Sequence, residues 1–127
     1  MKLAYKKTGS GRPLIILHGL FGMADNWLTI AGRIARNHTV YLLDQRNHGQ
    51  SPHSPEFSYR ILAEDLQDFI REHDLGDVRL IGHSMGGYLV QKYALDHQVP
   101  GLVLLSSPSL MGLASAVPVA IHGVAAI

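Results

Sequence analysis

Short apolar runs alternate with apolar residues at helical spacing along this chain. Four runs of mainly aliphatic residues are brief and continuous, as expected for strands that are buried on both faces of a sheet. They cover residues 14–17, 39–43, 78–81 and 102–105. Residues 2–7 alternate only weakly between apolar and polar positions and predict an edge strand.

Helical spacing of apolar residues separates these runs. It predicts a helix over residues 27–36 and another around residues 89–94. Ser58 is the predicted N-cap of a further helix that ends near His73. The apolar stripe of that helix comprises Leu62, Leu66, Phe69 and Ile70. Strands that alternate with helices in this way predict an α/β fold, with a mostly parallel sheet and helices on both of its faces.

The strongest chemical signal lies between the third central strand and the next helix, where residues 82–87 read Gly-His-Ser-Met-Gly-Gly. A Gly-x-Ser-x-Gly pattern in this context is typical of a nucleophile elbow, a strained turn that exposes the serine hydroxyl above the sheet. Small residues at Gly82 and Gly86 let strand and helix approach closely. We therefore predict Ser84 as a nucleophile; the alternative interpretation is a glycine-rich turn that holds a serine by chance.

A second glycine-containing loop, residues 18–22, follows the first central strand. Acyl-transfer enzymes stabilise the oxyanion with two backbone N–H groups, one from the residue after the nucleophile and one from an upstream loop. Met85 is therefore the first predicted donor and Leu20 the second, with Phe21 as the fallback. Their side chains remain free to line an acyl pocket.

Five residues in or near these motifs receive a further interpretation. Phe21 and His83 are predicted substrate-binding residues, although the side chain of His83 should point away from the serine. His18 has no second ligand at metal-binding spacing and is interpreted as a histidine that braces its loop. Asp44 and Arg46 lie in a polar loop after the second central strand, and we expect this charged pair to fix the loop through backbone hydrogen bonds rather than to act in catalysis.

Four motifs together resemble those of the α/β-hydrolase superfamily, and within it those of the small cytoplasmic serine esterases. The motifs are His-Gly-Leu-Phe-Gly at 18–22, Asp-Asn-Trp at 25–27, Asp-Gln-Arg-Asn-His-Gly-Gln-Ser-Pro at 44–52 and Gly-His-Ser-Met-Gly-Gly at 82–87. The similarity is close up to about Gly87 and generic beyond it. It implies hydrolysis of an ester or thioester through an acyl-serine intermediate on Ser84, with no metal and no organic cofactor.

The chain departs from this family after the serine. Family members place an acid and then a histidine after the nucleophile. Here the only later acid is Asp96, about 18 Å from Ser84 along a helix, and the later histidines are His97 and His122. We expect His122 to reach the serine only by an unusual path. The resemblance therefore implies the N-terminal half of an α/β-hydrolase domain, which lacks the C-terminal strands and the distal acid and histidine of the triad.

Composition limits the classes of protein and of binding partner that fit this chain. The chain has 127 residues, 46% hydrophobic and 17% charged, which fits one small domain. Its formal net charge of +1 gives no electrostatic reason for a nucleic-acid partner. The absence of cysteine excludes disulfides and thiolate metal sites and fits a cytoplasmic protein. The apolar segment 110–127 is too short and too interrupted for a membrane span, and we expect it to begin a lid or to form a truncated tail.

Two hypotheses about function follow, from different classes. In the first, the chain belongs to a serine esterase, with a small-molecule acyl ester or thioester as substrate. In the second, it is a non-catalytic fragment or remnant that self-associates, or binds a partner, through the open sheet edge expected beside residues 102–105. A different reaction on the same serine, such as C–C bond cleavage or perhydrolysis, is a weaker third alternative.

Overall fold

The computed structural model describes residues 1–97, 99–105 and 119–122. Its elements follow in the order β1 (Tyr5–Gly9), β2 (Arg12–Leu17), η1 (Ala24–Trp27), α1 (Leu28–Ile34), β3 (His38–Leu43), α2 (Tyr59–Glu72), β4 (Arg79–His83), α3 (Met85–Asp96), β5 (Leu102–Leu105) and β6 (Val119–His122). The predicted alternation of strands and helices is confirmed, and most boundaries differ from the predicted ones by a few residues.

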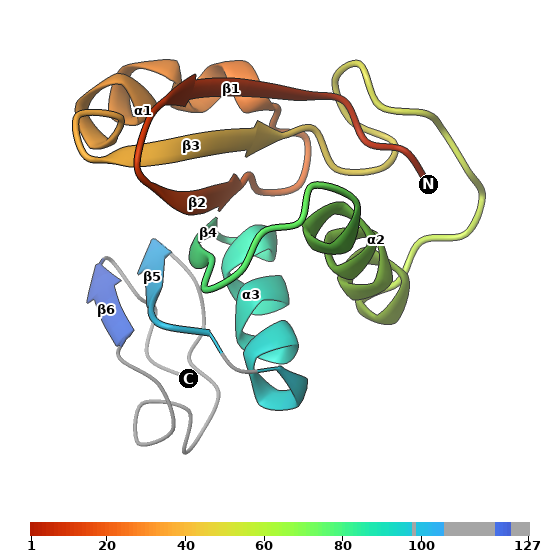
Figure 1. The fold of residues 1–127 in the computed structure, drawn as a ribbon. Coiled ribbons are helices and arrows are strands. Elements are labelled where there is room, and N and C mark those ends of the chain that lie inside the picture. The colour runs from red at the N-terminus through yellow and green to blue at the C-terminus, as the bar shows by residue number, and fades with distance from the viewer. Residues whose placement is uncertain (98, 106–118, 123–127) are drawn as a thin grey trace.

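The strands form one six-stranded sheet in the order β1-β3-β2-β4-β5-β6 (Figure 1). Only β1 runs antiparallel to its neighbour, and it forms one edge, as predicted. The other four pairings are parallel. Because the carboxyl ends of the parallel strands meet at one edge, the loops after β2, β3 and β4 are brought together there.

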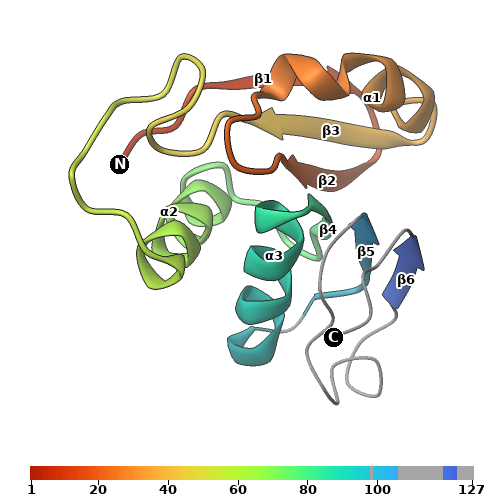
Figure 2. The same ribbon diagram turned by 180° about the vertical axis from the view of Figure 1, so that it is seen from behind.

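Helices cover both faces of the sheet, which confirms the predicted layer arrangement (Figures 1 and 2). On one face, α2 and α3 bury Leu66, Phe69 and Leu89 against Ile15 and Leu80 of the central strands. On the other face, η1 and α1 bury a smaller cluster; its buried members are Leu14, Ile16, Ala24, Ala31, Val40, Leu42 and Ile81. Alternate residues of β2 therefore point into different cores, as the pleat of a strand requires.

The strand β6 extends the sheet beyond the predicted last strand. It pairs parallel with β5, so the edge expected to be open beside residues 102–105 is paired with residues 119–122. A four-residue strand within an apolar segment has no alternation that would separate it from its surroundings, which explains why the pattern did not predict it. The rest of the predicted lid or tail segment lies outside the described residues.

Candidate functional site

Ser84 occupies a strained turn between β4 and α3. Its backbone has φ 51° and ψ −112°, in a region that non-glycine residues rarely adopt. Such a conformation costs about 1–3 kcal/mol and persists only where the surrounding structure imposes it. The residue is exposed, so the turn presents its side chain at the carboxyl edge of the sheet.

Two glycines make this turn sterically feasible. A Cβ atom on Gly82 would overlap the main-chain carbonyl of Gly86. A Cβ atom on Gly86 would in turn overlap the carbonyl of Leu17 and lie 2.7 Å from the carbonyl oxygen of His18. The first turn of α3 therefore packs directly on β4, as the sequence motif predicted, and it also packs on the end of β2.

The serine opens onto a cleft of about 550 Å³. Eight described residues line it: Leu20, Phe57, Ser58, Tyr59, Leu62, Ser84, Met85 and Tyr88. None of these eight carries a carboxylate, an imidazole or a formal charge. The cleft thus brings together the predicted nucleophile and both predicted main-chain donors, Leu20 and Met85.

Sequence reasoning missed the aromatic wall of this cleft. Tyr59 and Tyr88 come from the starts of α2 and α3, and their ring centroids lie 4.5 Å apart. Burial is the main cause of the raised pKa of Tyr59, and the neighbouring Tyr88 adds to it. Exposed aromatic residues on either side of the Ser58 N-cap, Phe57 and Tyr59, were the one signal in the sequence that marked this wall.

A second cleft of about 450 Å³ adjoins the first. Leu20 and Phe57 line both clefts, so these two side chains form the boundary between them. Phe21 lines only the second cleft and is 91% exposed. His83 is not among the described residues that line either cleft. Its ring instead packs against that of Trp27, with the ring centroids 5.3 Å apart. Direct substrate contact by Phe21 or His83 stays a prediction.

The loop after β2 forms a tight turn in which the N–H of Gly22 donates to the carbonyl oxygen of Gly19 at 2.9 Å. Phe21 occupies the third position of the turn with φ 62°, a position that favours glycine. Its N–H donates to Nε2 of His48 at 3.0 Å. Gly19 lies above the serine, since a Cβ atom there would be 3.2 Å from the Cβ of Ser84.

The loop after β3 supports this turn at two further points. His18 and Gln45 are joined by two hydrogen bonds: the backbone N–H of Gln45 donates to Nε2 of His18 at 3.0 Å, and Nε2 of Gln45 donates to the carbonyl oxygen of His18 at 2.7 Å. The carboxylate of Asp44 accepts from the N–H of Ala24 at 2.8 Å and from the N–H of Gln50 at 3.0 Å. The predicted loop-bracing roles of His18 and Asp44 are thus present in the structure.

Burial lowers the pKa of His18 below its ordinary value of 6.5. The ring is only 1% exposed, and desolvation disfavours the imidazolium form. The carbonyl of Gly19, which faces Nδ1 at 2.7 Å, opposes this effect only partly. The His48 ring lies 4.9 Å away, centroid to centroid, and also lowers the pKa, whereas Asp44 raises it.

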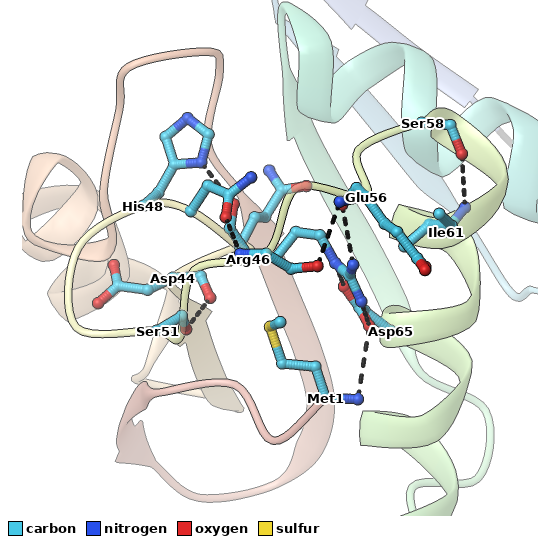
Figure 3. Close-up of polar contacts among 12 residues, drawn as sticks. Met1, Asp44, Arg46, His48, Ser51, Glu56, Ser58, Ile61 and Asp65 are labelled. Carbon is cyan, nitrogen blue, oxygen red and sulfur yellow. Dashed lines mark hydrogen bonds and ion pairs between the residues drawn. The ribbon is translucent and has the colours of Figure 1, made fainter.

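Arg46 fixes the same loop to α2, as Figure 3 shows. Its guanidinium forms a bidentate pair with the buried carboxylate of Asp65, at 2.6 and 2.9 Å. A third N–H donates to the carbonyl oxygen of Glu56 at 2.9 Å. The predicted structural role of Arg46 is therefore present, but its partner Asp65 was not foreseen, because that aspartate lies within the buried face of α2.

The later acid and histidines are placed differently from one another. Asp96 is the last residue of α3, at the opposite end of that helix from the serine, as expected. In the sheet register, Leu105 of β5 pairs with His83 on one side and with His122 of β6 on the other. The backbone of His122 therefore lies at the same end of the sheet as Ser84, about 10 Å from His83.

Residues 1–97, 99–105 and 119–122 contain no group of three or more potential metal ligands. No helix in this part of the chain has the length and apolar character needed to cross a membrane.

Comparisons with known proteins agree with this geometry. The sequence profile of the alpha/beta hydrolase fold family matches residues 12–124. The sn-1-specific diacylglycerol lipase ABHD11 of Danio rerio is 41% identical over 107 residues, 80% of this chain and 34% of that protein. A probable alcohol acetyltransferase of Saccharomyces cerevisiae is 46% identical over 90 residues, 67% of this chain and 26% of that protein.

The solved structure of a marine microorganism esterase superposes with a TM-score of 0.79 and 48% identity, over 81% of this chain and 41% of that one. The chain thus spans well under half the length of the proteins it matches. Its esterase-named and lipase-named relatives are enzymes of hydrolase type. The match over most of the chain shows that it belongs to the α/β-hydrolase fold family.

Proposed function

We propose that this chain carries the nucleophile and the oxyanion-binding groups of a serine hydrolase that cleaves carboxylic esters or thioesters. One observation carries the proposal: Ser84 is held at φ 51° between β4 and α3 and opens onto a cleft. A strained, exposed serine at a strand-to-helix turn has the geometry of a nucleophile elbow. The names of the relatives, an esterase and a lipase among them, support ester chemistry.

In the proposed reaction, Oγ of Ser84 forms a bond to the carbonyl carbon of the substrate, and the carbonyl oxygen becomes an oxyanion. The N–H groups of Leu20 and Met85 stabilise that oxyanion. The N–H of Met85 suits this role because it belongs to the first turn of α3, where no preceding helical carbonyl is available to accept it. Collapse of the intermediate releases the alcohol or thiol, and water then releases the acid from the acyl-serine.

The serine proton must pass to a base for this attack to be fast. The eight described residues that line the cleft contain neither histidine nor carboxylate, so we propose that the base comes from outside this group. His122 is the first histidine to test, because its backbone lies at the same sheet end as Ser84. The absence of the family's distal acid and histidine from this chain stays a prediction.

The lining of both clefts favours uncharged substrates. Among the described residues, the linings of the two clefts contain no aspartate, glutamate, lysine or arginine, although Asn47 and His48 line the second cleft. Apolar and aromatic side chains instead predominate, and they meet at Leu20 and Phe57. We propose an ester or thioester whose acyl and leaving groups are both uncharged, with one group in each cleft.

Ester hydrolysis tests this proposal directly. The purified chain should hydrolyse 4-nitrophenyl esters of monocarboxylic acids, whose acyl group is uncharged, faster than monoesters of dicarboxylic acids, whose acyl group carries a free carboxylate. The Ser84→Ala substitution should reduce the rate to that of buffer. A matched control is Ser58→Ala, which alters the other serine hydroxyl in the same cleft. Hydrolysis by the parent chain that Ser84→Ala retains in full would refute the assignment of the nucleophile, whereas no hydrolysis by either protein would favour the non-catalytic alternative.

A second candidate function has its own observation. The yeast relative is named a probable alcohol acetyltransferase, and such a reaction would use an alcohol instead of water to remove an acyl group from the serine. Product analysis in the presence of ethanol distinguishes the two outcomes, because transfer yields an ethyl ester and hydrolysis yields an acid. The non-catalytic alternative, self-association through a sheet edge, predicts a concentration-dependent molecular mass and no Ser84-dependent chemistry.

A further inference from the structure

His48 has a fixed tautomer and a fixed place above the turn formed by residues 19–22. Its Nδ1 faces the carbonyl oxygen of Arg46 at 2.9 Å and must donate to it, and its Nε2 accepts from the N–H of Phe21 at 3.0 Å. This pair of bonds assigns a neutral ring with the proton on Nδ1. The loop around the ring is itself held, since the N–H of His48 donates to the carbonyl oxygen of Gln45 at 3.0 Å.

The turn needs an external partner because of Phe21. A bulky residue at φ 62° is strained, and its side chain, 91% exposed, gains almost no packing in return. The hydrogen bond to His48 is the contact recorded for the N–H of this residue. That bond fixes the central peptide of the turn in the orientation that a positive φ at Phe21 requires.

The neighbouring peptide, between Gly19 and Leu20, carries the proposed oxyanion donor. Its carbonyl oxygen accepts from the N–H of Gly22 at 2.9 Å and faces Nδ1 of His18 at 2.7 Å. Because a trans peptide directs its C=O and N–H to opposite sides, the N–H of Leu20 points away from both donors. Among the described residues, no acceptor is recorded for this N–H, which leaves it available to a ligand.

We propose that His48 is a positioning residue for the oxyanion hole: by accepting from the N–H of Phe21, it holds the turn in the shape that presents the N–H of Leu20 beside Ser84. The inference rests on the proposed function for its catalytic consequence. It also decides between the two candidate donors from the upstream loop, because the N–H of Phe21 is already bonded to His48 and only that of Leu20 is available.

Two amide substitutions separate this role from a merely structural one. In His48→Gln, the side-chain oxygen reaches the place of Nε2 and can accept from Phe21. In His48→Asn, the shorter side chain reaches only the place of Nδ1. Its amide N–H can still donate to the carbonyl oxygen of Arg46, but the hydrogen bond from the N–H of Phe21 is lost. The same two substitutions at His53, which is exposed in the same loop, are the matched controls.

Turnover and amide exchange are the two readouts. We expect His48→Asn to lower kcat for a 4-nitrophenyl ester about tenfold with little change in KM, and His48→Gln to restore most of it. Hydrogen exchange at the amide of Phe21 should accelerate at least tenfold in the Asn variant and stay near that of the parent chain in the Gln variant. Exchange at Ile16, in the buried β2, reports whether the fold is intact.

The outcomes are distinguishable. Equal kcat and equal Phe21 exchange in the Asn and Gln variants would overturn the role of His48. Failure of Ser84→Ala to lower turnover would refute the proposed function, while the exchange data would still decide whether His48 holds the turn. If His48→Asn unfolds, Phe21→Gly supplies the second test: glycine accepts φ 62° without strain, so the effect of His48→Asn must shrink in that background. An undiminished effect would contradict the inference.

Discussion

Gly86, in the first turn of α3, lies against the main-chain carbonyl of Leu17 at the end of β2. A methyl group on Gly86 would overlap that backbone oxygen, and neither partner is a flexible side chain that could move away. We therefore expect Gly86→Ala to lower the free energy of unfolding by about 3 kcal/mol or more, measured by urea denaturation. Gly32→Ala is the matched control, because a Cβ atom on Gly32 of α1 meets nothing within 4 Å. It should stabilise the protein by about 0.5–1 kcal/mol.

Backbone strain at Ser84 predicts that two small substitutions, Ser84→Gly and Ser84→Ala, differ in their free energy of unfolding. Ser84→Gly removes the cost of φ 51°, whereas Ser84→Ala keeps a Cβ atom in the same strained conformation. We expect the glycine variant to unfold with a free energy about 1 kcal/mol higher than that of the alanine variant. Both variants should lose activity. A glycine variant less stable than the alanine variant would show that the backbone at Ser84 is not strained.

The buried pair of Arg46 and Asp65 fixes the loop after β3 to α2. Removing one charge of such a pair leaves the other buried without a counter-charge, so Asp65→Asn should destabilise the fold by about 3–5 kcal/mol. Glu64→Gln is the control on the same helix, since its ion pair with Arg60 is exposed and contributes only about 0.3–0.5 kcal/mol. If urea denaturation showed similar decreases in the free energy of unfolding for Asp65→Asn and Glu64→Gln, the buried pair would not contribute more to stability than the exposed one.

His18 predicts a pH dependence of stability. Its pKa in the folded chain lies below the ordinary 6.5, so the unfolded chain binds more protons in the interval between the two values. The contribution of His18 is therefore complete above about pH 6.5 and declines as the pH falls through that interval, by at most about 1.4 kcal/mol per pH unit. The stability difference between the parent chain and His18→Gln should narrow from pH 7.5 to pH 5. A difference that widens at low pH would give the shift the opposite sign.

The sequence predicted the parts of the site that local pattern determines. Ser84 and its flanking glycines lie within six consecutive residues. The strand directly before them and the helix directly after them require a tight turn at the serine. The support for the oxyanion turn was only partly predictable. The loop-bracing role of His18 was predicted because no second ligand lies at metal-binding spacing, whereas the bond from Phe21 to His48 joins residues 27 positions apart.

Other parts depend on how distant segments meet. Asp65 reads as an ordinary polar position on a helix, and only the approach of α2 to the loop after β3 buries it beside Arg46. Tyr59 and Tyr88 form one wall of the cleft because the starts of α2 and α3 come together, which no spacing within either helix reveals. The strand β6 was missed because an apolar run of four residues has no period to detect.

The cytoplasmic location and any self-association stay predictions. Size-exclusion chromatography with light scattering at several concentrations tests the second of these. On the other edge of the sheet, all five residues of β1 are exposed and two of them are lysines, which disfavour pairing between edges. We therefore expect no self-association through the β1 edge. The double substitution Lys6→Val and Lys7→Val should increase self-association.

The most direct test of the central claim is reaction of the intact chain with a fluorophosphonate, followed by intact-mass measurement of the parent, Ser84→Ala and His122→Ala proteins. The account predicts one phosphonyl adduct on the parent chain and none on Ser84→Ala. Loss of the adduct in His122→Ala would identify that histidine as the base, and its retention would direct the search to another group. A folded parent chain that forms no adduct, or an adduct that persists in Ser84→Ala, would contradict the assignment of Ser84 as an activated nucleophile.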